Sequence, residues 1–211
     1  AANLAPGRAD LGVMLPCTPL HDLLLGDLGF PVVATSGNRS GEPIAIDNEE
    51  ALVRLGDLAD GFLVHDRPIL RPLDDSVARV VAGRTQLLRR ARGYSPNLAL
   101  PIQVPPGRGA TGGHLKTTVA MSTRAGVVLS QHLGDMDSIL SRKELDRTTD
   151  NLQQLFATIP RHWAHDGHPD YYTTRYAQAR GEEQCAVQHH VAHIAAVMAE
   201  HGVNEPVLGV A

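Results

Sequence analysis

The chain has 211 residues, 43% of them hydrophobic and 20% charged, and its formal net charge is -4 at pH 7. These values are typical of a globular protein with one large or two modest domains, and they give no indication of a nucleic-acid partner held by charge. Two cysteines, no apolar run of membrane length and no signal-peptide pattern in residues 1–8 favour a reducing, cytoplasmic location with no membrane partner.

Predicted helices and strands alternate through the first hundred residues, which indicates an α/β fold. Both helices begin with capping residues: a threonine followed by proline in one, and an aspartate three residues ahead of a glutamate in the other. The predicted elements, in order, are a helix from Thr18 to Gly29, a strand over 31–35, a helix from Asp47 to Leu55, a strand over 61–65 and a hairpin over 77–90.

Two stretches of this half carry residue types suited to a ligand. The loop 36–43 follows a predicted strand and combines glycines with serine and asparagine, which suits a polar or anionic ligand but also a plain turn. Arg89, Arg90 and Arg92 form a basic cluster that can clamp phosphate, although charged residues also protect an edge strand from aggregation. Residue type alone leaves both alternatives open.

A second domain is predicted after a break at residues 101–109, which contain three prolines and two glycines. Nine of the eleven histidines lie from His114 onward, and we therefore divide the chain into domains 1–103 and 104–211. The elements predicted for the second domain are a hairpin over 119–130, a helix opened by a capping box at Ser141 and Glu144, a strand over 163–166, a helix ending near Gly181, a strand over 185–187, a helix over 189–201 and a strand over 207–211.

The helix over 189–201 carries a candidate metal site. His189 and His193 are one turn apart, so their imidazoles project from the same face at a spacing that one metal ion can bridge, whereas His190 points elsewhere. Two histidines are too few for tight binding, so a carboxylate ligand is expected from beyond Ala211. The competing interpretation is a pair of partly buried or solvent-facing polar residues.

Seven stretches, in the same order along nearly the whole chain, resemble the HypF carbamoyltransferases, which help to build the cyanide ligands of NiFe hydrogenases. Any one stretch can arise by chance, but the ordered series is specific. The stretches are Leu11–Pro16 with Thr18–His21, Thr35–Pro43, Asp74–Val77, Arg89–Tyr94, Leu129–Asp135, His168–Tyr171 and His189–His193.

The resemblance implies a partial YrdC-like α/β domain that forms carbamoyl adenylate from ATP and carbamoyl phosphate, followed by the first part of an actin-like (ASKHA) α/β domain. The second domain would transfer the carbamoyl group to the carboxyl-terminal cysteine of the partner HypE. The site residues implied by match to the family are Ser36 and Asn38 for the adenylate, Ser76 and Arg89 for its phosphate or carbamoyl end, Gly113 and Lys116 for the nucleotide of the second site, and His189 and His193 for zinc or iron, with magnesium accompanying ATP.

The family's acylphosphatase-like and zinc-finger regions are missing, as is the first half of the YrdC-like domain, so we expect an internal fragment that does not complete turnover alone. Three alternatives remain. They are a threonylcarbamoyl-adenylate synthase or transferase of tRNA modification, whose YrdC-like fold can bind RNA, an antibiotic O-carbamoyltransferase, and a non-catalytic nucleotide-binding module.

Overall fold

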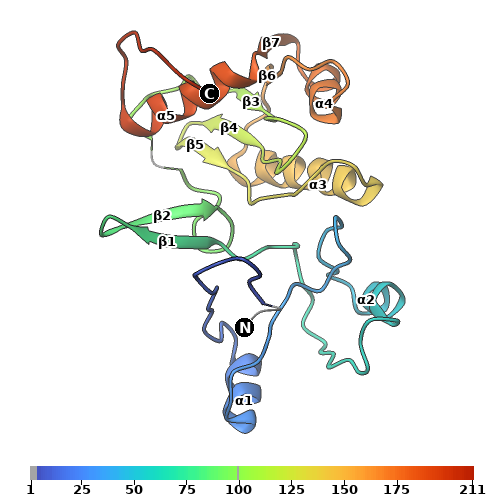
Figure 1. The fold of residues 1–211 in the computed structure, drawn as a ribbon. Coiled ribbons are helices and arrows are strands. Elements are labelled where there is room, and N and C mark those ends of the chain that lie inside the picture. The colour runs from blue at the N-terminus through green and yellow to red at the C-terminus, as the bar shows by residue number, and fades with distance from the viewer. Residues whose placement is uncertain (1–3, 99) are drawn as a thin grey trace. The chain divides into compact units, whose positions relative to one another are not determined.

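The computed structural model describes residues 4–98 and 100–211, so the first three residues of the stretch searched for a signal peptide lie outside the described part. The chain forms two compact units, Ala1–Thr35 and Ser36–Ala211. Both helices and strands are present, as Figure 1 shows, and the predicted α/β class is confirmed. Within the described residues, no helix is long and apolar enough to cross a membrane.

The first unit contains the helix α1 (Pro19–Leu28). The Thr18 side chain accepts a hydrogen bond from the backbone N–H of His21 at 3.2 Å, and proline occupies the first helical position. Gly29 ends the helix with φ 67°, a left-handed conformation that glycine adopts without steric cost. The predicted helix is confirmed because its start and stop are both encoded in neighbouring residues.

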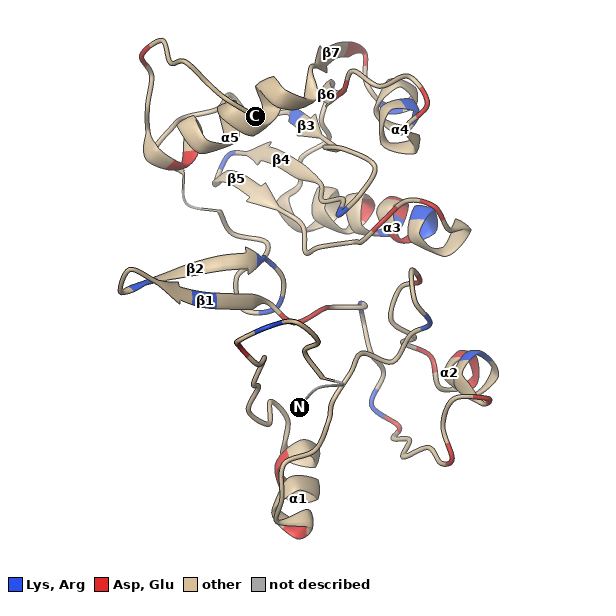
Figure 2. Cartoon of the chain, viewed as in Figure 1, with Lys and Arg blue, Asp and Glu red and all other residues tan. Residues whose placement is uncertain are grey.

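The second unit begins with the helix α2 (Asn48–Leu55), which Asp47 caps by accepting from the N–H of Glu50 at 2.9 Å. The strands β1 (Val77–Val81) and β2 (Arg84–Arg89) then form the predicted antiparallel hairpin, with a register shift between Val77 and Ala78. All charged residues of this hairpin are arginines, which Figure 2 shows in blue. The hairpin therefore presents only positive side-chain charge.

A five-stranded sheet dominates the rest of the unit, with the strand order β5-β4-β3-β6-β7. The strand β4 is antiparallel to both of its neighbours, whereas β3, β6 and β7 run parallel to one another. This is the arrangement of an actin-like domain. The elements are β3 (Arg108–Ala110), β4 (Ala120–Thr123), β5 (Gly126–Leu129), α3 (Ile139–Phe156), β6 (His162–Asp166), α4 (Tyr172–Arg180), β7 (Glu183–Val187) and α5 (His189–His201).

The core of this domain lies around Trp163, whose side chain is 1% exposed. Other buried members come from the strands and from α3 and α4, and they include Val119, Met121, Leu145, Leu152 and Tyr176. A Cβ atom at Gly109 would lie only 2.8 Å from the Trp163 ring, so glycine lets the ring rest on β3.

The break predicted over 101–109 is wrong for its last two residues, Arg108 and Gly109, which belong to β3. The strand forms because it is hydrogen-bonded to β4 on one side and β6 on the other. The local sequence does not indicate such pairing.

The helix α3 starts earlier than predicted. Its N-cap is Ser138, whose hydroxyl accepts from the N–H of Ser141 at 2.9 Å, so the predicted capping box at Ser141 and Glu144 is wrong. Glu144 is instead buried inside the helix, where Thr148 donates to it at 3.0 Å and Arg147 pairs with it. Burial raises the pKa of Glu144 and outweighs the opposing effect of these partners.

Three predicted strands, over 31–35, 61–65 and 207–211, are wrong, because the structure has irregular chain there. Their apolar side chains are largely exposed, with Val33 at 72% and Leu63 at 68%. A strand is defined by hydrogen bonds to a neighbouring strand, and in the described residues these three runs pair with none. An apolar run is thus insufficient evidence for a strand.

Candidate functional site

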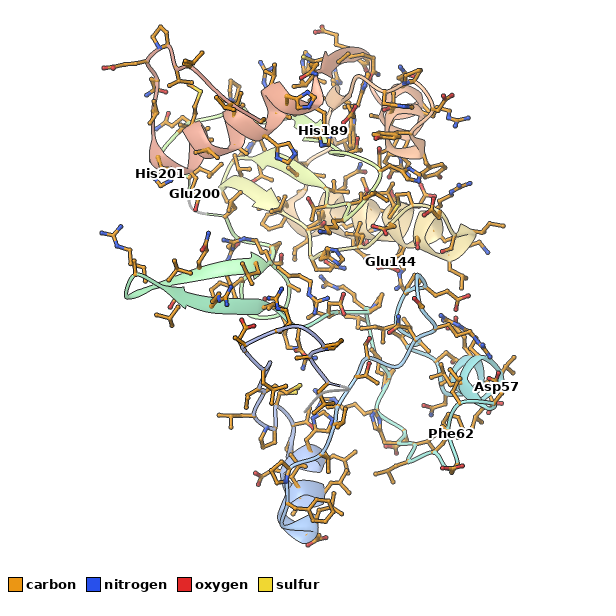
Figure 3. The ribbon with its side chains drawn as sticks, in the orientation of Figure 1. Asp57, Phe62, Glu144, His189, Glu200 and His201 are labelled. Carbon is orange, nitrogen blue, oxygen red and sulfur yellow. The ribbon has the colours of Figure 1, made fainter. Side chains whose placement is uncertain are left out.

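The histidine pair lies in the first two turns of α5, directly after β7. Gln188 caps this helix by accepting from the N–H of Val191 at 3.1 Å. The Nε2 atoms of His189 and His193 converge to 3.1 Å, while the Nδ1 atom of His190 lies 2.7 Å from the Gln188 side chain. Figure 3 shows His189 at the start of α5 and His201 at its far end. The i and i+4 spacing therefore brings two imidazole nitrogens to one point.

Asp166, at the carboxyl end of β6, forms a hydrogen bond with the imidazole of His189. Its Oδ2 atom lies 2.6 Å from Nδ1 of His189, and its Oδ1 atom accepts from the N–H of His168 at 2.8 Å. The carboxylate is 7% exposed. Burial alone would raise the pKa of Asp166, but the hydrogen bonds from His189 and His168 outweigh it, so the pKa lies below its ordinary value.

The ionised carboxylate fixes the protonation of His189. Because Asp166 accepts a hydrogen bond, Nδ1 of His189 carries a proton, and this contact favours the tautomer that has its lone pair on Nε2. A carboxylate bound to the second nitrogen of a ligand histidine is a recurring feature of metal sites. Sequence reasoning missed Asp166, although a carboxylate at the end of a predicted strand was the available indication.

Gly113 lies against the same pair. A Cβ atom at this position would be 3.3 Å from Cε1 of His189 and 3.8 Å from Oδ2 of Asp166. Lys116 lies three residues on with φ 52°, and its N–H donates to Oδ1 of Asp135 at 2.8 Å. Of the two residues assigned to the second nucleotide site, Gly113 thus borders the histidines, and Lys116 is held through its backbone.

A pocket of about 550 Å³ opens beside His189 and Asp166. One wall carries His168 and Tyr171, whose rings stack with centroids 4.2 Å apart, and Gln188 lies at the helix start. The side chain of His189 is 51% exposed, so its ring is accessible from this open space. A small polar substrate therefore has room beside His189.

The donor set fits a metal ion with open coordination positions. Two neutral imidazoles suit zinc or iron, and the carboxylate of Asp166 supports one of them. Within residues 4–98 and 100–211 no group of three or more His, Cys, Asp or Glu side chains is arranged to hold a metal ion. Metal binding by His189 and His193 stays a prediction.

Asn38, in the loop after residue 35, closes that loop upon itself. Its side-chain N–H₂ donates to the carbonyls of Arg39 at 3.0 Å and Glu42 at 2.9 Å. Its Oδ1 atom is buried and has no hydrogen-bond partner among the described residues. The carbonyl of Ser36 accepts from the N–H of Asn38 at 3.0 Å. The loop therefore offers one unused acceptor, as a ligand-binding loop can.

Ser76 and Arg89 lie together at the base of the β1–β2 hairpin. The Ser76 hydroxyl donates to the carbonyl of Arg92 and accepts from the N–H of Ala91, both at 2.8 Å. Nε of Arg89 donates to the carbonyl of Asp75 at 3.0 Å, and a terminal nitrogen of Arg89 lies 3.6 Å from Oδ2 of Asp74. These contacts place a serine and an arginine at one end of a positively charged hairpin.

Comparison with known proteins agrees with this architecture. Residues 107–200 match the family model described as HypF Kae1-like domain, and residues 1–91 match the Sua5/YciO/YrdC model described as Telomere recombination. Carbamoyltransferase HypF of Synechocystis sp. is 51% identical over 211 residues, which covers 99% of this chain and 28% of that protein. Carbamoyltransferase HypF2 of Cupriavidus necator is 43% identical, covering 100% of this chain and 29% of that protein.

Solved structures give the same result. Full-length HypF in the phosphate- and nucleotide-bound form superposes with a TM-score of 0.90 at 43% identity, covering 98% of this chain and 34% of that one. HypF of T. kodakarensis superposes with a TM-score of 0.86 at 36% identity, covering 96% of this chain and 27% of that chain.

The fold and the site thus define an α/β protein that joins a YrdC-like region to an actin-like, Kae1-like domain carrying a histidine pair. The chain belongs to the HypF carbamoyltransferase family. It spans less than a third of the length of the curated relatives, at 28% and 29%. The predicted family and fold are confirmed.

Proposed function

We propose that this chain serves carbamoyl transfer, in which carbamoyl adenylate is formed from carbamoyl phosphate and ATP and its carbamoyl group passes to the carboxyl-terminal cysteine of HypE. One observation carries the proposal: the Nε2 atoms of His189 and His193 converge at 3.1 Å while Asp166 binds the other nitrogen of His189. The names of the relatives support carbamoyl transfer, and the nucleotide and phosphate in a related structure support the cofactors.

A zinc or iron ion would be held by His189 and His193, and when bound it would act as a Lewis acid that polarises a carbonyl or anchors a phosphate. Asp166 keeps the lone pair of His189 on Nε2, where a ligand needs it. Gly113 leaves the ring its space, because any side chain there would approach Cε1. Asp166 and Gly113 thus act on the orientation of the His189 ring.

The basic hairpin suits the anionic part of an adenylate. Carbamoyl adenylate is a mixed anhydride with one negative charge on its phosphate, and arginine binds such oxygens through paired, charge-assisted hydrogen bonds. Arg89 would supply this charge, Ser76 lies beside it, and the unpaired Oδ1 of Asn38 would accept from the nucleoside, with magnesium accompanying ATP. In the transfer step, the cysteine sulfur bonds to the carbonyl carbon, the bond from that carbon to the AMP oxygen breaks, and the thiol proton leaves.

The test compares metal binding and transfer in two double variants. The variant His189→Ala/His193→Ala removes both converging nitrogens, and His190→Ala/His201→Ala removes two histidines of the same helix as a matched control. We expect only the first variant to lose the zinc held by this helix, measured by chelator competition in a HypF protein that extends beyond Ala211 and can supply the expected carboxylate. In a full-length HypF that carries this sequence, it should also lose carbamoyl transfer to a peptide of the HypE carboxyl terminus. Equal metal content and equal transfer in both variants would refute the proposal.

Product analysis separates the alternative functions. The full-length protein is incubated with ATP, carbamoyl phosphate and one of three acceptors: the HypE peptide, threonine with bicarbonate, or a hydroxylated antibiotic. Labelled product on threonine or on the antibiotic would favour the threonylcarbamoyl or O-carbamoyl reactions. Nucleotide binding without carbamoylated product on any of the three acceptors would favour the non-catalytic nucleotide-binding module.

A further inference from the structure

An extended segment, Gln131–Asp135, follows β5 and touches both candidate sites. Its successive residues bond to opposite neighbours, as extended chain requires. The N–H of His132 donates to the carbonyl of Arg90 at 3.1 Å, and the next N–H, that of Leu133, donates to the carbonyl of Thr117 at 2.9 Å. The segment is thus hydrogen-bonded between the hairpin end of the first site and the loop of the second.

At the hairpin end, nitrogen atoms of a histidine and an arginine face one carboxylate oxygen. Nδ1 of His132 and a terminal nitrogen of Arg89 each lie 3.6 Å from Oδ2 of Asp74. Nδ1 is buried and has no hydrogen-bond partner within the described residues, so this contact is electrostatic rather than a full hydrogen bond. The interaction with His132 lowers the pKa of Asp74 against the effect of burial, and Arg89 acts in the same direction.

The other end of the segment holds the loop beside the histidine pair. The N–H of Thr117 donates to the carbonyl of Gly134 at 2.9 Å, and the Thr117 hydroxyl donates to the carbonyl of Gly113 at 3.0 Å. Asp135 accepts from the N–H of Lys116. The hydrogen bonds thus run from the hairpin to Gly113, where an added Cβ atom would lie 3.3 Å from Cε1 of His189.

We propose that His132 is a positioning residue for Arg89 in the adenylate-forming site, and that Gln131–Asp135 ties this site to the loop 113–117. This rests on the proposed function of Arg89. With His132 present, the charge of Asp74 is shared between two partners, and the Arg89 guanidinium stays available to substrate phosphate. Without His132, Asp74 draws the guanidinium to itself.

The kinetic test uses carbamoyl-phosphate-dependent exchange between ATP and pyrophosphate in a full-length HypF carrying this sequence. For His132→Ala we expect the KM for ATP to rise on the order of tenfold, because the adenylate phosphate that Arg89 would bind comes from ATP. His132→Asn puts an amide nitrogen where Nδ1 lies and should recover most of the loss, whereas His132→Gln should not. His162→Ala, an exposed histidine on β6, is the control and should behave as the parent protein.

A parent-like KM in His132→Ala would overturn the proposal. So would an equal loss in all three His132 variants accompanied by a lower Tm, since that pattern denotes a general packing role. If the parent protein shows no exchange between ATP and pyrophosphate, the proposed function fails. The connection between the hairpin and the loop 113–117 is then tested by amide hydrogen exchange.

Hydrogen exchange is measured on the 211-residue chain and needs no turnover. In His132→Ala, the amide protons of Arg92, Thr117 and Leu133, which donate to Asp74, Gly134 and Thr117, should exchange on the order of tenfold faster. Unchanged exchange at Arg92 and Thr117 would overturn the link between the two sites.

Discussion

Replacing Asp166 with asparagine tests the metal centre without removing a ligand. The asparagine side chain has one oxygen and one N–H₂ group, so it cannot accept from both His168 and His189 as the carboxylate does. If its oxygen keeps the bond to the N–H of His168, the N–H₂ group faces Nδ1 of His189. Two donors cannot face each other, so the imidazole must move its proton from Nδ1 to Nε2.

The expected loss of zinc affinity follows from the transfer of that proton to Nε2. A charge-assisted hydrogen bond contributes about 1.5 to 3 kcal/mol, and loss of such an outer partner typically weakens metal binding by about 10- to 100-fold. The two ranges agree, since tenfold corresponds to about 1.4 kcal/mol. We therefore expect Asp166→Asn to raise the Kd for zinc by about 10- to 100-fold in chelator competition. Asp170→Asn, an exposed aspartate of the same loop, should leave the Kd unchanged.

Two further measurements distinguish a change in the His189 tautomer from a change in the stability of the folded chain. Nitrogen NMR of the imidazoles should report protonation of His189 at Nδ1 in the parent chain and at Nε2 in the variant. The lowered pKa of Asp166 stabilises the folded chain above the ordinary carboxyl pKa of about 4, and this contribution is lost as the pH falls through the folded-state pKa. The difference in unfolding free energy between parent and Asp166→Asn should therefore shrink below about pH 4. An unchanged zinc Kd with an unchanged His189 tautomer would refute the reasoning.

Two other substitutions test the packing around the site and in the core. Gly113→Ala places a methyl group 3.3 Å from the His189 ring, so zinc affinity should fall several-fold in the same titration. Gly61→Ala is the control and should have no effect, because its added Cβ meets nothing within 4 Å. Equal zinc affinities in the two variants would contradict the contact between Gly113 and His189. Leu145→Ala empties a fully buried position of α3 and should lower the free energy of unfolding in urea by about 2 to 5 kcal/mol. Leu155→Ala, on the same helix but 56% exposed, is the matched control, and similar losses in both would argue against the core described here.

Much of the site was predictable because its information is local. The pair His189 and His193 needs only a helix, and the capping glutamine and terminal glycine of that helix lie within its own sequence. Family resemblance assigned Ser76 and Arg89 to the phosphate or carbamoyl end of the adenylate. The hairpin register places the two residues near each other. Their binding roles stay predictions, since no ligand contact tests them.

Other features of the site depend on residues far apart in the chain. Asp166 meets His189 across 23 positions because β6 and β7 run parallel, and His132 meets Asp74 through an extended segment that has no sequence pattern of its own. Neither contact can be derived from spacing or composition, because strand order decides which chain ends meet.

The sequence by itself determined the capped helices, both hairpins, the histidine spacing and the family, because each depends on interactions over a few residues or on residue identity. Only the tertiary structure decided which apolar runs became strands. Three runs with strand-like composition stayed irregular, whereas Arg108–Ala110, whose first two residues lie in a predicted linker, became a strand between two partners. The physical reason is that a helix satisfies its hydrogen bonds internally, while a strand requires a neighbour that only the folded chain supplies.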